Sequence, residues 1–151
     1  MNRIVSAGFI VRMRDGRYFL GKADSHTEPC WTIFKGKQDD GESLIDTAIR
    51  ELKEESGIDV CADDRLNKNI STVPIFKFSM RDKDVYVFSL YDEEGVLDNF
   101  VPFCDSYYGV GSNKRPEIAA YGKFTLDEVA QKIFPSQLGL VEFLKKKESY
   151  I

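Results

Sequence analysis

The chain has 151 residues, of which 42% are hydrophobic and 30% charged, and this composition fits a single domain over residues 1–151 that buries a core. The net charge of −4 argues against nucleic-acid binding driven by overall charge, although short capped RNA ends remain open as ligands. Cys30, Cys61 and Cys104 are odd in number and far apart, which fits neither a disulfide framework nor a set of zinc ligands. We interpret them as reduced, intracellular thiols.

The N-terminal region does not resemble a signal peptide, because residues 1–16 turn polar early, and no apolar run of the chain is long enough to cross a membrane. We therefore expect a cytosolic protein without a membrane partner. Residues 4–13 and 17–22 are apolar and β-prone, and the Asp15-Gly16 dipeptide between them favours a tight turn. This pattern predicts a first β-hairpin.

A polar loop and a short strand follow the hairpin. Residues 23–30 are polar and include the only histidine, His26, which we expect at the surface, with a catalytic role as the alternative interpretation. Residues 31–34 are apolar and predict a short strand that leads into a turn bracketed by glycines. Lys35 and Lys37 at the end of this strand can meet phosphates as point charges, with solvated lysines as the alternative interpretation.

The stretch 36–58 combines an acid-rich turn with an amphipathic helix. Gly36 and Gly41 allow positive φ or a close approach of the backbone to a ligand. Asp39 and Asp40 precede the helix, where acids are favoured. The apolar stripe of the helix is formed at helical spacing by Leu44, Ile45, Ala48, Ile49 and Leu52.

Three carboxylates lie beside this apolar stripe. Glu51, Glu54 and Glu55 fall within an arc of about 100° on a helical projection. Like charges at this spacing destabilise a helix by a few tenths of a kcal/mol per pair, so the cluster needs either open solvent or a cation. Mg²⁺ binds a few carboxylates and fills its remaining positions with waters and phosphate oxygens. A solvated helix face and a metal site for phosphate chemistry are therefore the two interpretations of this cluster.

The second half of the chain begins with residues 59–72, which are charged and irregular. Residues 75–80 and 84–91 are β-prone and predict a second hairpin across a polar turn. Aromatic residues alternate along its two strands, and we expect most of them in the core, with stacking on a nucleobase as the alternative. These aromatic residues are Phe76, Phe78, Tyr86 and Phe88.

Residues 92–116 form the longest connection in the chain, and long loops in compact domains are often functional. Tyr107, Tyr108, Lys114 and Arg115 give this connection aromatic and cationic groups suited to a nucleotide and its phosphates. A flexible insertion is the alternative interpretation.

The C-terminal region predicts a strand over 118–125 and then two helices. Thr125 and Glu128 have the spacing of a capping box at the start of the first helix. Pro135 breaks the chain, and the final helix over 136–147 ends in three lysines that suit its negative C-terminal dipole.

The stretch 36–58 resembles the Nudix box of the Nudix hydrolase superfamily. That pattern is Gly, five residues, Glu, seven residues, Arg-Glu, an aliphatic residue, any residue, Glu-Glu, any residue, Gly and an aliphatic residue. Every fixed position is met, and a chance match at a given start is on the order of one in a billion. The matching residues are Gly36, Glu42, Arg50, Glu51, Leu52, Glu54, Glu55, Gly57 and Ile58.

The order of strands and helices predicts an α/β fold with a mixed sheet between helices, which the resemblance sharpens to an α/β/α Nudix sandwich. The C-terminal region is also similar to that of one Nudix subgroup. The resemblance implies hydrolysis of a nucleoside diphosphate linked to another moiety, with Mg²⁺ as the cofactor and Mn²⁺ as a substitute. It also implies a nucleotide-derived small-molecule substrate, and members of the family are often homodimers.

The resemblance also implies roles for individual residues. Carried over by position, Glu51, Glu54 and Glu55 are metal ligands, and Glu51 additionally assists as the base. Arg50 orients Glu51, and Glu42 holds the loop through salt bridges. The carbonyl of Lys35 or Gly36 completes the metal shell.

Family members often add an acid from outside the box, and Glu117, which precedes the predicted strand 118–125, is our candidate for this metal-binding or catalytic acid. An ordinary acid at a strand edge is the alternative interpretation of this residue. The residues that compete with it for the role are Asp92, Glu93 and Glu94.

The box does not name the substrate. Lys35 before Gly36 is similar to diadenosine polyphosphate hydrolases, although Phe34 stands where those often have proline. We rank dinucleoside polyphosphates and ADP-ribose first, then flavin or nicotinamide dinucleotides, then capped or 5′-triphosphate RNA ends. A nucleotide sensor without turnover and an RNA-end pyrophosphohydrolase are the alternatives. A protein of this length and charge is also similar to the Nudix proteins of T-even bacteriophages, which would place it in the host cytoplasm.

Overall fold

The computed structural model describes residues 2–25 and 27–149, so His26 lies outside the described residues. The strands are β1 (Ile4–Arg12), β2 (Tyr18–Ala23), β3 (Trp31–Thr32), β4 (Phe34–Lys37), β5 (Phe76–Met80), β6 (Lys83–Tyr91), β7 (Tyr107–Tyr108), β8 (Arg115–Pro116) and β9 (Ile118–Phe124). The helices are α1 (Leu44–Ser56), α2 (Asp64–Asn67), α3 (Leu126–Lys132) and α4 (Leu138–Glu148), with 3₁₀ turns at Gly111–Asn113 and Pro135–Gln137.

A mixed sheet forms the centre of the fold. Its strands follow the order β3-β2-β1-β6-β5, with β4 paired to β1 and β9 paired to β2. The β1–β6 pair is parallel, and the other pairs are antiparallel. Gly36 of β4 lies opposite Ala7 of β1, so the strand that leads into the acid-rich turn is held against the middle of the sheet.

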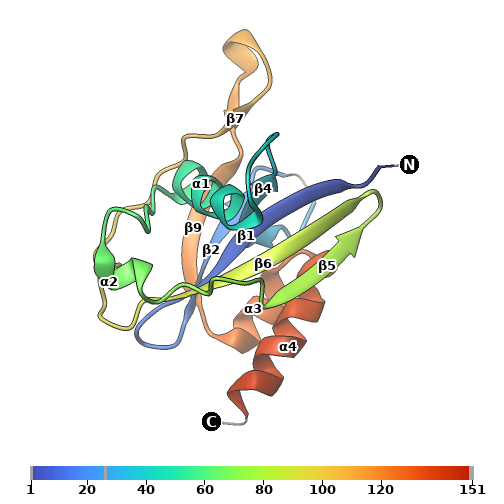
Figure 1. The fold of residues 1–151 in the computed structure, drawn as a ribbon. Helices are drawn as coiled ribbons and strands as arrows, with labels where there is room; N and C mark the ends of the chain where they lie inside the picture. The colour runs from blue at the N-terminus through green and yellow to red at the C-terminus, as the bar shows by residue number, and fades with distance from the viewer. Residues whose placement is uncertain (1, 26, 150–151) are drawn as a thin grey trace.

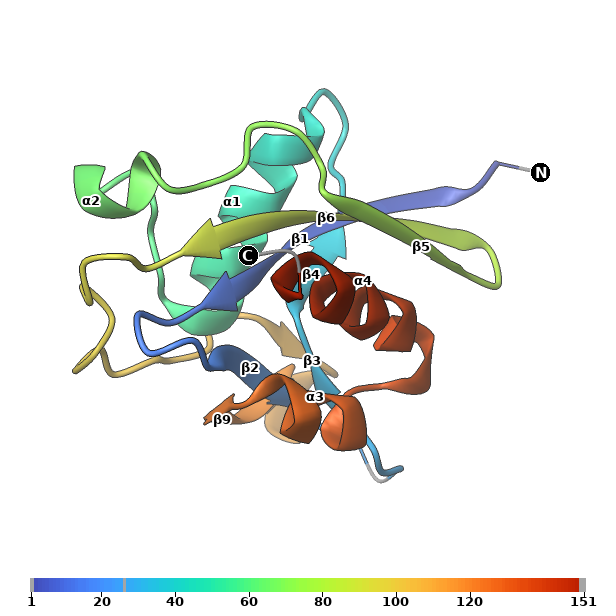
Figure 2. The ribbon, with the colours of Figure 1, turned by 90° about the horizontal axis from the view of Figure 1, so that it is seen from below.

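Helices cover both faces of this sheet. Figures 1 and 2 show α1 on one face and α3 and α4 on the other. Side chains of β1 alternate between the two faces, as the period of a strand requires. Phe9 and Val11 belong to the cluster under α1, whereas Ile10 belongs to the cluster under α3 and α4. The predicted α/β/α sandwich is therefore confirmed.

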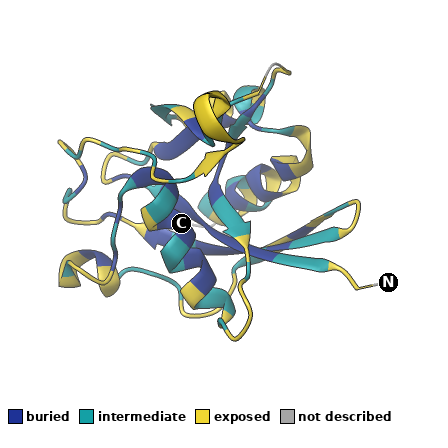
Figure 3. Ribbon diagram, turned by 90° about the horizontal axis from the view of Figure 1, so that it is seen from above, coloured by how far each residue is buried: buried dark blue, intermediate teal, exposed yellow. Residues whose placement is uncertain are grey.

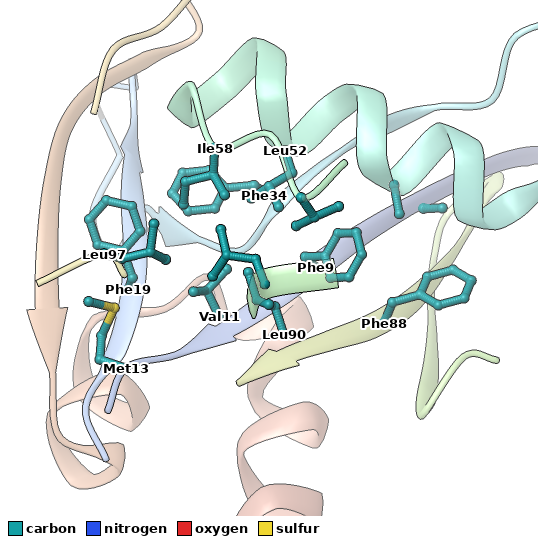
Figure 4. Close-up of a cluster of buried hydrophobic side chains, with 14 residues drawn as sticks. Phe9, Val11, Met13, Phe19, Phe34, Leu52, Ile58, Phe88, Leu90 and Leu97 are labelled. Carbon is teal, nitrogen blue, oxygen red and sulfur yellow. The ribbon is translucent and has the colours of Figure 1, made fainter. Parts of the chain in front are cut away.

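The predicted apolar stripe of α1 is the part of the helix that faces the sheet. Ala48 and Leu52 are fully buried, and the other stripe residues are partly buried against the same cluster. Figure 4 shows Leu52 of α1 above Phe9 and Phe34 of the sheet. Full burial of a side chain such as Leu52 is worth about 1.5–3 kcal/mol. This packing fixes the rotation of α1, and the ribbon of α1 in Figure 3 accordingly carries buried, intermediate and exposed residues.

Both predicted hairpins, the Thr125–Glu128 capping box and the break at Pro135 are present. The strand predicted over 31–34 is instead two short strands, because the N–H of Ile33 donates to the Gln137 side chain and interrupts the ladder. The irregular segment 59–72 contains the helix α2, which Asp63 caps by accepting from the N–H of Arg65. None of the helices among the described residues is long and apolar enough to span a membrane.

The long connection 92–116 is more regular than its sequence indicates. Strands β7 and β8 pair as a small separate sheet, and this hairpin projects from the body of the molecule in Figure 1. Asp24 anchors its base, because Arg115 Nη2 donates to Asp24 Oδ1 at 2.8 Å and the Tyr108 hydroxyl donates to the same carboxylate. This hairpin, the β7–β8 arm, is thus tied to the loop that follows β2.

Candidate active site

Helix α1 has defined ends that set the positions of its glutamates. Ser43 caps the N-terminus, where its hydroxyl oxygen accepts from the N–H of Asp46 at 3.2 Å. Gly57 ends the helix at φ 82°, and its N–H donates to the carbonyl of Lys53. A residue with a side chain would be strained at this φ, since a left-handed conformation favours glycine. The last two turns of α1 therefore lie in a fixed register beside β4.

Two carboxylates of these last turns pack against β4. The N–H of Lys35 donates to Glu55 Oε1 at 3.0 Å. A Cβ atom on Gly36 would lie 2.1 Å from Glu51 Cδ, so only glycine leaves room for the Glu51 carboxylate. Glu51 and Glu55 are 7% and 5% exposed, and both acids are thus largely removed from solvent.

This burial changes the acidity of both groups. Burial, together with the charge of Glu54, raises the pKa of Glu51 to about 7, although Arg50 opposes the shift. Burial and then the charge of Glu51 raise the pKa of Glu55 well above its usual range, and Glu117 contributes to both shifts. Desolvation and like charges both disfavour the ionised form. A bound cation would offset both the desolvation of these carboxylates and their mutual repulsion.

Arg50 joins the acid-rich turn to α1. Its Nε donates to Glu42 Oε2 at 2.8 Å, and its Nη2 donates to Glu42 Oε1 at 3.0 Å and to the carbonyl of Lys37 at 2.9 Å. These hydrogen bonds from Arg50 are the main reason that the pKa of Glu42 falls to about 2. The structure thus shows the salt bridge that was expected to hold the loop.

The same guanidinium also reaches the glutamates of the last turns. Arg50 Nη1 donates to Glu51 Oε1 at 2.9 Å and lies 3.2 Å from Glu54 Oε2. Among the described residues, no three acidic, histidine or cysteine side chains are gathered as a preassembled metal cluster, and here Glu51 and Glu54 contact Arg50. The donors at this place are carboxylate and carbonyl oxygens, which are the ligands that Mg²⁺ prefers. The chemistry of these donors fits a hard divalent cation.

A groove of about 310 Å³ runs along β4 and contains part of this site. It brings Glu117 together with Glu55, and the charge of Glu117 also acts on Glu51. The candidate chosen from outside the box therefore lies beside the box glutamates. The residues that line the groove are Ala23, Thr32, Ile33, Lys35, Gly36, Lys37, Glu55, Lys83, Glu117, Ile118 and Phe134.

The alternative candidates for the acid from outside the box do not lie in the groove. Asp92 is fully buried, and its carboxylate accepts from the N–H groups of Val96 and Leu97 at 2.9 and 2.8 Å. Glu94 pairs with Lys68 at 2.6 Å. Neither acid lines the groove, and Glu93 does not line it either.

The structure does not bring every predicted substrate-binding residue to the groove. Lys35 and Lys37 line it, but Tyr107, Tyr108 and Arg115 do not. Arg115 and Tyr108 bind Asp24 at the base of the β7–β8 arm. The aromatic and cationic residues of this connection are chemically suited to a nucleotide. In the fold, however, they lie on the projecting β7–β8 arm.

Sequence reasoning missed three residues near the glutamates. Lys83 lies within the turn predicted between 75–80 and 84–91 but begins β6 and lines the groove, and Phe134 also lines it. The hydroxyl of Tyr121 donates to the carbonyl of Glu55 at 2.5 Å and holds the last turn of α1. Phe134 beside Pro135 carried no periodic signal, because only the tertiary fold places it near β4.

Comparisons with known proteins show which family this chain belongs to. A family model described as the NUDIX domain matches residues 2–145. This chain belongs to the Nudix hydrolase family. An RNA pyrophosphohydrolase of Sphingopyxis alaskensis is 42% identical over 52 residues, which is 34% of this chain and 33% of that relative. The match therefore spans about a third of the curated relative's length.

Two solved structures share the fold of this Nudix chain. An Ap4A hydrolase binary complex from C. elegans has a TM-score of 0.63 at 18% identity, with 98% of this chain and 99% of that chain covered. A bifunctional NMN adenylyltransferase/ADP ribose pyrophosphatase from Francisella tularensis, complexed with AMP and a Mn ion, has a TM-score of 0.68 at 13% identity. That similarity covers 97% of this chain and 42% of the other.

Proposed function

We propose that this Nudix protein hydrolyses the pyrophosphate bond of nucleoside diphosphates linked to another moiety, with Mg²⁺ as cofactor and Mn²⁺ as a substitute. One observation carries the proposal: two buried carboxylates with raised pKa values, Glu51 and Glu55, lie against β4 beside a groove that three lysines line. Perturbed acids at a cleft are typical of functional sites.

The cation would be held by carboxylates from two parts of the chain. Glu51, Glu54 and Glu55 would supply them from α1, Glu117 would supply one from the residue before β9, and the carbonyl of Gly36 is a further oxygen donor. When bound, a divalent ion neutralises the diphosphate and acidifies a water.

The remaining steps are assigned to side chains of this chain. Glu51 is our candidate for the base, since a pKa of about 7 suits proton transfer near neutral pH. Arg50 contacts the Glu51 carboxylate at 2.9 Å and orients it. Lys35 and Lys37 bind phosphate oxygens from the groove wall.

Dinucleoside polyphosphates and ADP-ribose are the substrates that we rank first, followed by flavin and nicotinamide dinucleotides. The support is the fold shared with an Ap4A hydrolase and with an enzyme that includes an ADP ribose pyrophosphatase. The 52-residue likeness to an RNA pyrophosphohydrolase favours capped or 5′-triphosphate RNA as a second candidate. The retained box acids weigh against a sensor without turnover. A single domain over 1–151, a cytoplasmic location and a homodimer stay predictions.

A substrate panel tests this function. The protein is incubated with Mg²⁺ or Mn²⁺ and with ADP-ribose, diadenosine tri- and tetraphosphate, FAD, NADH, nucleoside triphosphates or 5′-triphosphate RNA, and the products are separated by chromatography. AMP plus a phosphorylated partner from the dinucleotides is the expected result. Cleavage of RNA ends alone would favour the second candidate, and binding without products would favour a sensor.

A further inference from the structure

The groove along β4 is lined by two chemically different kinds of residue. Glu55, Glu117 and three lysines are charged, whereas Ile118 and Phe134 are apolar. Sites for small molecules combine an apolar wall with a few placed polar groups. The charged residues belong to the diphosphate chemistry proposed above, whereas the apolar residues have no role in that chemistry.

Phe134 differs from most other phenylalanines of the chain. All eleven phenylalanines lie in the described part of the chain, and only Phe103 and Phe134 stay outside both hydrophobic clusters. Phe134 is half-buried, lines the groove and has no aromatic ring partner among the described residues. Its ring is therefore a flat apolar surface that the core does not use.

The backbone around Phe134 is held firmly. The N–H of Phe134 donates to the carbonyl of Trp31 at 2.9 Å. Gln137, which is 1% exposed, accepts from the N–H of Ile33 at 3.1 Å and donates to Thr32 Oγ1 at 2.9 Å. These bonds tie the turn after α3 to the break between β3 and β4. The backbone that carries Phe134 is thus held in place by the fold itself.

Three of the residues that line the groove are lysines. Lys35 and Lys37 come from β4, and Lys83 comes from the start of β6. Within residues 2–25 and 27–149, the ammonium groups of these three lysines form no ion pair. Unpaired lysines around a shared groove are suited to phosphate oxygens.

We propose that the groove recognises one nucleotide end of the substrate, with the base stacked on Phe134 and the phosphates on Lys83 and Lys35. This inference rests on the proposed function and adds the subsite that selects the substrate. The groove volume of about 310 Å³ is at the lower end of the range of about 300–1,000 Å³ for ligand pockets. The second moiety of a dinucleotide therefore stays outside the groove and is only weakly selected.

Substitution of Phe134 tests the stacking surface. Because one stacked base contributes substantially to affinity, Phe134→Ala should weaken AMP binding and raise KM for ADP-ribose and diadenosine triphosphate by about 10-fold or more, with kcat nearly unchanged. Phe134→Trp should keep both values near wild type. Tyr91→Ala is the matched control, since it removes an exposed aromatic ring outside the groove.

Substitution of Lys83 tests the phosphate contacts. Lys83→Ala should weaken binding of α,β-methylene-ADP by about 5-fold or more and leave adenosine binding unchanged, because only the phosphates meet this ammonium group. Lys77→Ala, from the neighbouring strand and outside the groove, is the matched control. Equal loss of adenosine and α,β-methylene-ADP binding would contradict the phosphate contact.

These measurements separate the subsite from the proposed function. Direct titration of AMP in EDTA reports on the Phe134 surface without any hydrolysis. Unchanged AMP affinity and unchanged KM in Phe134→Ala would overturn the subsite and leave hydrolysis intact, as would a larger KM increase in Tyr107→Ala. Weaker AMP binding by Phe134→Ala, in a protein that cleaves no member of the panel, would support the subsite and reject the hydrolase proposal.

Discussion

The two ends of the Nudix box place carboxylates in opposite electrostatic states. Glu42, at the entry to α1, accepts two hydrogen bonds from Arg50, and its pKa falls to about 2. Glu51 and Glu55, in the last two turns, are buried beside each other, and their pKa values rise. One end therefore favours the ionised carboxylate, and the other end opposes it.

This difference separates the contacts that hold the loop from the carboxylates that we propose for the chemistry. The Arg50–Glu42 pair joins the turn after β4 to α1 and stabilises the fold. Buried carboxylates that repel each other reduce stability, so their presence indicates a group that binds them in the working state. Substitutions at each end of the box either separate the two ends further or show that they behave alike.

The largest expected loss of activity is at the C-terminal end of α1, where the box glutamates repel one another. Glu55→Gln and Glu54→Gln should each reduce kcat by about 100-fold or more, on the scale of removing one charge-stabilising group from an active site. Without metal, the stability against unfolding should change little, or should increase for Glu55→Gln, because the amide carries no buried charge. Steady-state kinetics and thermal unfolding check this. Glu142→Gln on the exposed side of α4 is the control, and full activity of both box variants would contradict the metal assignment.

Gly36→Ala should also act at this end. The new methyl group would lie 2.1 Å from Glu51 Cδ and must displace that carboxylate. A displacement of about 1 Å can cost about 100-fold in rate, so we expect a loss of about 10- to 100-fold in kcat/KM. Gly139→Ala in α4, where a Cβ meets nothing closer than 3.4 Å, is the matched control. Equal activity of the two variants would show that the close contact has no catalytic consequence.

At the other end, Glu42→Gln should mainly affect stability. The variant loses charge-assisted hydrogen bonds to Arg50, and we expect the free energy of unfolding to fall by about 1–2 kcal/mol. Activity should fall less than in Glu55→Gln. Urea denaturation measures the change. A Glu42→Gln protein of wild-type stability would remove the distinction between the two ends.

The smallest expected effect is on the pH dependence of folding stability, to which the two ends of the box contribute with opposite sign. The folded pKa of Glu51 is about 7 against a usual value of 4.5, so the folded form binds more protons and its stability falls as pH rises from about 4.5 to 7. Glu42, with a pKa of about 2, loses its stabilising effect as pH falls from about 4.5 to 2. Denaturation in EDTA should show both trends, and Mg²⁺ should abolish the first. A stability that rises from pH 5 to 7 in EDTA would contradict the assignment for Glu51.

Much of the fold could be predicted because it depends on local patterns. Alternation along β1, the stripe of α1 and the Thr125–Glu128 box each lie within a few residues, and the structure follows them. Helix α2 has only four residues and left no periodic signal. The division of 31–34 into two strands depends on Gln137, which is about a hundred residues away in the chain.

The site divides in the same way between local and distant contacts. The glutamates of α1 are grouped by helical spacing, and Glu117 could be selected because it precedes a predicted strand. Lys83 and Phe134 meet in the groove only through the tertiary fold. The aromatic and cationic residues of 92–116 have chemistry suited to a nucleotide, but composition does not show that they lie on a hairpin that projects from the body of the molecule.

The most direct test of this account is the number of protons released when Mg²⁺ binds, measured by titration calorimetry in two buffers with different ionisation enthalpies. Metal ligands must lose their protons, so raised pKa values at Glu51 and Glu55 predict release of about one proton or more per ion at pH 6, and fewer at pH 9. Glu42→Gln should release the same number as wild type. Binding of Mg²⁺ at pH 6 without proton release would contradict the assignment of these carboxylates as the cation site.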